Sequence, residues 1–162
     1  MVKFLEPDSI SNIALTEDDC LATLTNYAQW SPDATSFVRL EHPTNGKVVF
    51  TLRDYTRTGF VSLIGLFDPS FTHNEDCYQR AHVLYACHNI TQIIVDGLFV
   101  GPEARPISKG QQVIVEFNGQ HVTISVPSLR GGSYSHEITW PKGFVFGLYM
   151  TIIGESWHVT EV

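Results

Sequence analysis

Hydrophobic positions along the chain fall in short runs that alternate with polar positions, and turn residues separate the runs. Alternation with a period of two is typical of strands with one buried face, whereas an amphipathic helix repeats its apolar positions every three to four residues. The clearest case is 111–127, where two alternating runs flank Asn118-Gly119, a pair that favours a tight hairpin turn. Further strands are expected at 46–54, 59–68, 80–88, 92–100, 144–153 and 156–162. The run at 59–68 is almost entirely apolar, which predicts a strand buried on both faces.

The chain outside these runs contains two segments whose pattern is less regular. Residues 13–26, IALTEDDCLATLTN, are read as two short strands around an acidic turn, although Thr16-Glu17-Asp18-Asp19 also resembles the start of a helix. Residues 128–136, SLRGGSYSH, are expected to form a Gly/Ser loop that bends at Gly131-Gly132. Many short strands with turns between them indicate a β-sandwich or a barrel. We therefore expect a single all-β domain over 1–162, with few or no helices.

Composition and charge narrow the classes of function that fit this fold. Apolar residues make up 43% of the 162 residues, so the chain can bury a core. The formal net charge is −7 and the ten basic residues are scattered, which disfavours nucleic acid and anionic membranes as partners. From this pattern we expect no export signal and no membrane span. The three cysteines are an odd number, which suggests free thiols in a reducing compartment and hence a cytoplasmic location.

Catalytic patterns are missing from the strands. A sandwich hydrolase needs two carboxylates on one face of a cleft, which in a strand means acids at positions i and i+2 or i+4. Glu116 stands alone in its strand, Asp96 falls in a turn, and Glu75-Asp76 are adjacent in a polar loop. No nucleophile elbow and no phosphate-binding loop is present. We expect no catalytic residue, no cofactor and no enzymatic activity.

Histidine and cysteine gather in one segment of sixteen positions, at His73, Cys77, His82, Cys87 and His88. His73 and Cys77 together with Cys87 and His88 could be drawn as a zinc site. The paired spacings of structural zinc sites are absent, however, and Cys87 lies in an apolar run where a free cysteine acts as a small hydrophobe. We therefore expect no metal.

Large aromatic side chains with a polar edge remain as candidates for a binding surface. The last strand is expected to bury Trp157 in the core. Trp30 precedes the turn Ser31-Pro32 and is expected to be partly exposed, whereas Trp140, just before Pro141, could be either buried or exposed.

Residues 37–54, FVRLEHPTNGKVVFTLRD, resemble the early part of SPRY domains, especially the Ran-binding-protein-M-like branch. Val38, Arg39, His42 and Pro43 match the Val-Arg-x-x-His-Pro segment of that branch. Three further stretches are similar to later family motifs and occur in the same order, namely 59–68, 107–126 and 147–159. The Asn-Gly of one family strand and the closing Asn-Phe-Gly are missing. The resemblance covers about residues 20–162.

The resemblance implies a bent, jelly-roll-like sandwich of two antiparallel sheets that has no catalytic activity. Family members bind peptides or protein surfaces through loops at one edge. Arg39, His42 and Pro43 would then lie on a rigid loop that leads into a central strand, unless Arg39 only pairs with Glu41 to hold that loop.

By the same resemblance, Tyr78 or Tyr85 would lie near this loop. The Gly131-Gly132 loop would form another wall, with Tyr134 and Trp140 as aromatic anchors. The predicted partner is a protein or peptide. The alternative is a carbohydrate-binding sandwich like galectins or legume lectins, although VRLEHP and TW lack the galectin spacing.

Overall fold

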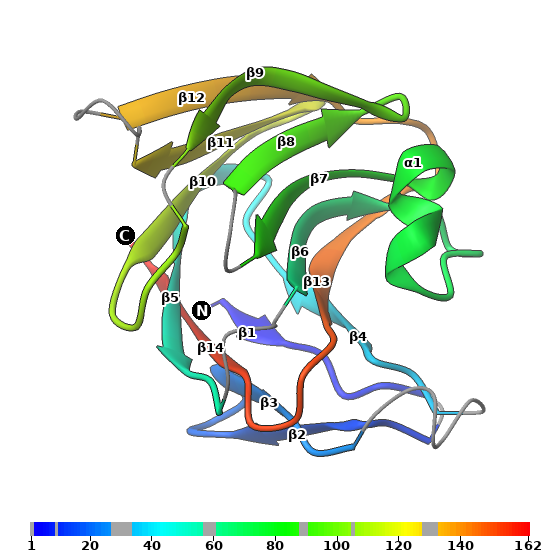
Figure 1. Ribbon diagram of the computed structural model, residues 1–162, viewed down its shortest axis with the longest axis vertical. Coiled ribbons are helices and arrows are strands. Elements are labelled where there is room, and N and C mark those ends of the chain that lie inside the picture. Colours follow the sequence, from blue (N-terminus) through cyan, green and yellow to red (C-terminus); the bar gives the residue numbers. More distant parts are fainter. Residues whose placement is uncertain are drawn as a thin grey trace.

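Two antiparallel sheets of seven strands each form the molecule in the computed structural model, which describes residues 2–8, 10–26, 34–56, 61–87, 91–104, 106–127 and 133–162. The first sheet has the order β1 (Lys3–Phe4), β4 (Phe37–Glu41), β13 (Val145–Met150), β6 (Val61–Phe67), β7 (Ala81–Cys87), β8 (Thr91–Val95) and β9 (Leu98–Ala104). The second has the order β12 (Ser133–Thr139), β11 (His121–Pro127), β10 (Gln112–Asn118), β5 (Asn45–Asp54), β14 (Ser156–Glu161), β3 (Leu21–Leu24) and β2 (Ile13–Thr16). Figure 1 shows that both sheets are bent, and the expected all-β sandwich is confirmed.

Helical structure in the described residues is confined to the connection between β6 and β7. A 3₁₀ turn, η1 (Asn74–Asp76), runs into one short helix, α1 (Cys77–Arg80). Figure 1 places α1 on the outer face of the first sheet, on the side away from the second sheet. The sequence pattern had placed Glu75 and Asp76 in an irregular polar loop. They are instead part of a helical turn. The described chain contains no helix of the length and apolar character needed to cross a membrane.

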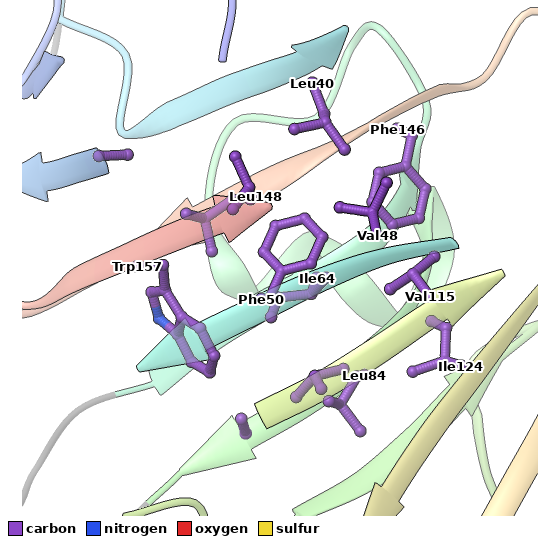
Figure 2. Close-up of a cluster of buried hydrophobic side chains, with 14 of the residues drawn as sticks. Leu40, Val48, Phe50, Ile64, Leu84, Val115, Ile124, Phe146, Leu148 and Trp157 are labelled. Atoms are coloured by element: carbon purple, nitrogen blue, oxygen red, sulfur yellow. The ribbon is translucent and has the colours of Figure 1, made fainter. Parts of the chain in front are cut away.

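The main hydrophobic core lies between the two sheets (Figure 2). Phe50 of β5 and Trp157 of β14 face Ile64 of β6 and Leu148 of β13 across this core, and all four side chains are fully buried. The burial of Trp157 confirms its expected place. Alternation along β10, in which every second side chain is buried, shows why the polar positions of this hairpin face outwards.

A second, smaller cluster covers the outer face of the first sheet. It consists of seven buried residues: Leu63, Phe67, Cys77, Ala81, Val83, Ile94 and Tyr149. Because Phe37 of β4, Phe71 and Cys77 of α1 pack on this face, β6 is buried on both sides. This arrangement confirms the expectation for the apolar run at 59–68 and gives it a physical cause.

The acidic turn in 13–26 connects β2 and β3, so the two-strand interpretation of this segment is confirmed and the helical one is wrong.

By contrast, the expected loop at 128–136 is wrong from residue 133 onward. Ser133–Thr139 form edge strand β12, which pairs with β11 along its whole length. Exposed residues alternate with half-buried or buried ones along β12, but the apolar pattern in the sequence is weak because His136 takes one of the inward positions. The Gly131-Gly132 bend lies outside the described residues.

Candidate partner-binding surfaces

Arg39 lies within strand β4 and not on a loop, so the predicted location of this residue is wrong. β4 alternates buried Val38 and Leu40 with exposed Arg39 and Glu41, which places Arg39 on the outer face of the first sheet. The backbone at Arg39 pairs with Gly147 of β13, and its carbonyl oxygen accepts a hydrogen bond from the Leu5 amide at 2.9 Å. The strand thus holds Arg39 more firmly than a loop would.

The guanidinium of Arg39 has no ion pair or hydrogen bond with the described side chains, Glu41 included. It borders a groove of about 610 Å³ between β4 and the segment at 5–8. We call this feature the Arg39 groove. Its apolar lining comes from Leu5, Pro7, Phe37, Val38, Pro69 and Val145, and its polar lining from Glu6, Asp8, Thr35 and Arg39. A fork of donors therefore lies beside a groove whose lining is partly apolar and partly acidic.

His42 and Pro43 do lie in the connection that leads from β4 into central strand β5, as predicted. The His42 side chain points to the interior, however, and its ring stacks on Phe117 with centroids 4.4 Å apart and planes at 9°. Its Nδ1 donates a hydrogen bond to the Pro43 carbonyl oxygen at 2.9 Å, which fixes the tautomer because a carbonyl can only accept. His42 therefore closes one end of the sandwich.

Trp140 belongs to the same end of the sandwich as His42. The two rings lie 5.2 Å apart, and Trp140 Nε1 donates a hydrogen bond to the Phe144 carbonyl oxygen at 2.8 Å. Loops at 42, 119–120 and 140–143 surround a depression of about 510 Å³ at this end. The half-buried Trp140 is thus committed mainly to packing, with one edge open to the depression.

Tyr134 lies in edge strand β12 and not on a loop wall. Its ring covers Gly101 of β9, where any Cβ atom would overlap the tyrosine. Its hydroxyl group and His136 Nδ1 are hydrogen-bonded at 3.2 Å. Tyr134 therefore joins the edge strands of the two sheets, and this contact explains its half-buried state.

Tyr78 of α1 and Tyr85 of β7 form a third surface with Phe99 of β9, which pairs with Ile94 of the outer cluster. The Phe99 ring stands nearly perpendicular to both tyrosines, with centroids 6.2 Å from Tyr78 and 6.0 Å from Tyr85. Exposed fractions are 46% for Tyr78 and 43% for Phe99. We call these three residues the Tyr78 patch. Phe99 was missed in the sequence, although a large aromatic residue that follows a tight Asp-Gly turn and one further residue was a usable signal.

The seven predicted residues therefore separate into distinct places. The structure brings His42, Pro43 and Trp140 to one end of the sandwich, and brings Tyr78 and Tyr85 together on the outer face of the first sheet. Arg39 shares that face, but β13, β6, β7 and β8 separate β4 from β9. Five strand spacings of about 4.8 Å put Arg39 about 24 Å from Phe99. A single short peptide therefore cannot contact all seven residues at once.

The described residues of the segment considered for zinc binding make other contacts. Cys77 is buried in the outer hydrophobic cluster, and this burial raises the pKa of its thiol to about 11. His73 is exposed and pairs with Asp76 at 3.7 Å. Across the described ranges, no group of three or more His, Cys, Asp and Glu side chains is placed to hold a metal ion. His88 lies outside the described residues, so metal-free folding stays a prediction.

No family model and no curated protein matches the chain by sequence. The fold, in contrast, is similar to solved SPRY domains. The TRIM65 PSpry domain gives a TM-score of 0.65 at 10% identity, over 98% of this chain and 91% of that one. The SPRY domain of human HERC1 gives 0.65 at 9% identity, over 98% of each chain. A human SPRY domain gives 0.58 at 9% identity, over 92% of this chain and 94% of that one. The chain therefore has a SPRY-like fold.

Proposed function

We propose that this SPRY-like sandwich is a non-catalytic interaction module that binds an extended segment of a protein partner in the Arg39 groove. The observation that carries the proposal is the exposed guanidinium of Arg39, which lies without a partner among the described side chains beside an apolar groove. A cytoplasmic adaptor role is part of the proposal, and the free thiols of Cys20 and Cys77 support it.

Rigidity makes Arg39 a suitable anchor. β1 and β13 flank β4, so the backbone loses little conformational freedom when a ligand binds. The guanidinium presents its donors in a plane, and this geometry suits the carbonyl oxygens of an extended chain or a terminal carboxylate. Apolar side chains such as Phe37 and Val145 would cover the ligand's own apolar residues.

The groove also limits the kind of ligand. Glu6 and Asp8 line its rim and lower the positive potential near Arg39. A highly acidic segment would be repelled by these two carboxylates. Backbone carbonyls of an uncharged, extended segment therefore fit this groove better than a run of acids does.

The test is capture of partners from lysate, followed by titration with a synthetic peptide from the strongest partner. Arg39→Ala should weaken that peptide's binding at least roughly tenfold, because a truncated arginine anchor typically loses about 2 kcal/mol. The melting temperature should stay nearly unchanged. Arg39→Lys should restore little binding, since lysine cannot copy the planar fork.

Glu41→Ala is the matched control, because Glu41 is an exposed charged residue two positions along the same face of β4. It should leave peptide binding unchanged. Normal binding by Arg39→Ala together with a lower melting temperature would make Arg39 a structural residue and refute the proposal. Sugar binding on a glycan array that free sugar competes away would favour the carbohydrate-binding alternative instead.

A further inference from the structure

The Tyr78 patch is an exposed aromatic corner that the Arg39 groove does not use. Three elements, α1, β7 and β9, contribute its side chains. Because the Phe99 ring is perpendicular to both tyrosine rings, at 81° and 87°, the three rings form walls and do not stack into a flat surface. Tyrosine and phenylalanine faces attract cations as well as apolar groups.

Backbone geometry holds the corner in place. The turn between β8 and β9 consists of Asp96 and Gly97, both with positive φ, at 52° and 79°. Gly97 packs so closely on the Tyr78 carbonyl that a Cβ atom there would overlap it, which ties the hairpin to α1. Val83 and Ile94 of the outer cluster are buried alongside in β7 and β8. The patch is therefore preformed and would lose little entropy on binding.

Strand β9 is an edge of the first sheet, but it is a poor template for an added strand. Gly101 has a positive φ of 71°, and its carbonyl oxygen accepts a hydrogen bond from Gln92 Nε2 at 2.9 Å. Pro102 has no N–H group to offer. A partner at this edge therefore has to use side-chain contacts with the patch and not backbone pairing.

Charge around the corner is negative. The described residues of η1, α1, β7, β8, β9 and the connecting turn carry four carboxylates: Glu75, Asp76, Asp96 and Glu103. Their one permanent cation is Arg80, which is engaged by the Ser70 hydroxyl at 2.6 Å. Asp96 is 85% exposed, and its carboxylate lies 3.7 Å from His82 Nε2. The Asp76 carboxylate is likewise 3.7 Å from His73 Nε2. The excess of carboxylates over permanent cations on these elements favours a positively charged ligand.

A second copy of this chain does not fit these charges. Each copy carries a net charge of −7. In a two-fold symmetric contact the patch would meet itself, so that Asp96 and Glu75 would face other carboxylates. Like charges placed together in this way oppose association.

We propose that the Tyr78 patch docks a basic segment of a protein partner, in which an arginine or lysine lies next to an apolar side chain. The apolar side chain packs on Phe99, and the cation lies over the face of Tyr78, where the neighbouring carboxylates favour it. This proposal is independent of the Arg39 groove, because the two surfaces are far apart on the sheet.

The test is selection of a random peptide library displayed on phage against the full chain, followed by titration of the selected, fluorescently labelled peptides. Peptides that compete with one another should be rich in Arg or Lys beside Leu, Phe or Trp. Phe99→Thr, which keeps a β-compatible residue, should weaken them at least roughly tenfold. The double variant Asp96→Asn, Glu75→Gln should weaken them about two- to tenfold and flatten the salt dependence. Asparagine is suited to the positive φ of residue 96, so this variant keeps the turn.

Ile114→Thr is the matched control, since Ile114 is an apolar residue of similar exposure on a strand of the second sheet. Neither Ile114→Thr nor Arg39→Ala should change binding of these peptides. Selected peptides without basic residues, or equal binding by Phe99→Thr, would overturn the proposal. Concentration-dependent dimerisation that Phe99→Thr abolishes would also overturn it and would assign the patch to a second copy.

Discussion

A carboxyl group lies buried between the sheets at Glu155. The Ser62 hydroxyl donates a hydrogen bond to Glu155 Oε1, and Trp157 Nε1 donates one to Ser62 Oγ at 3.0 Å. Glu155 Oε2 is buried and has no hydrogen-bond partner among the residues that the structure describes. Burial raises the pKa of Glu155 to about 8, because the charged form is poorly solvated there, although hydrogen bonds to the carboxyl group lower it in part. Glu155 is therefore mostly protonated in the folded protein at neutral pH.

The raised pKa predicts that this residue makes the fold less stable as the pH rises. An unfolded chain releases this proton near the model value of 4.5, whereas the folded protein keeps it up to about pH 8. Between these values the folded state binds more protons, so the free energy of unfolding falls as the pH rises and levels off above about pH 8. Glu155→Gln, which removes the charge and keeps the shape, should be more stable than the native protein at pH 8 and similar near pH 4.

Urea unfolding of both proteins at several pH values measures this difference. The comparison cancels other titrating groups such as His82, whose pKa is lowered by burial and which therefore favours folding as the pH rises through its usual pKa. Equal pH dependence of the two proteins would show that the Glu155 carboxyl group is solvated in the folded state. The Gly154-Glu155-Ser156 motif was visible in the sequence, but its burial was not, because a lone acid gives no sign of what packs on it.

At the scale of single elements, the turn between β2 and β3 carries unusual backbone strain. Glu17, Asp18 and Asp19 all have positive φ, at 53°, 55° and 65°. The left-handed conformation costs a non-glycine residue roughly 1 kcal/mol, and it normally occurs at single positions. Glu17 contacts both Arg53 and His158, at 3.4 and 3.5 Å, whereas the side chain of Asp18 is exposed. Asp18 is therefore the position at which the strain can be removed with the least loss.

Asp18→Gly should raise the free energy of unfolding by about 0.5–1 kcal/mol, since glycine adopts positive φ without a steric cost. Asp18→Ala should lower it, because alanine has neither this freedom nor a polar group suited to the conformation. Asp18→Asn removes the charge alone, so it separates charge repulsion from backbone strain. Thermal and urea unfolding of the three variants would measure the order, and an alanine variant as stable as the glycine variant would contradict the strain argument.

Elements were predictable from the sequence where local pattern and burial agree. The alternation in 111–127 and the Asn118-Gly119 turn specify β10 and β11 without reference to the rest of the fold. β12 was not predictable, because its outward residues are Ser, Glu and Thr and its inward residues include Tyr134 and His136, which are only half-buried. The predicted location of Arg39 was wrong for a related reason. Pro43 indicated a loop, but the five residues before His42 are held as a strand by β1 and β13, which lie far away in sequence.

At the scale of the whole molecule, the two hydrophobic clusters differ in what covers them. The main core is enclosed by two sheets, whereas the outer cluster is covered by η1, α1 and the segment before them. A helix of four residues is not stable by itself, and Asp76 at its N-cap makes no side-chain capping hydrogen bond. Side-chain packing and short-range hydrogen bonds, such as those from Thr72 to Asp76 and from Arg80 to Ser70, hold this cover in place. The outer cluster should therefore open more easily than the main core.

Cys77 reports on this opening, because its thiol is fully buried under α1. In a Cys20→Ser, Cys87→Ala variant, a thiol reagent should label Cys77 faster than the protein unfolds globally, with little dependence on low urea concentrations. Circular dichroism of the same variant gives the global unfolding rate. Because Tyr78 follows Cys77 directly, a basic peptide that occupies the Tyr78 patch should slow the labelling, and it should do so much less when Phe99 is replaced by Thr. Labelling at the global unfolding rate at every urea concentration would show instead that both clusters unfold as one cooperative unit.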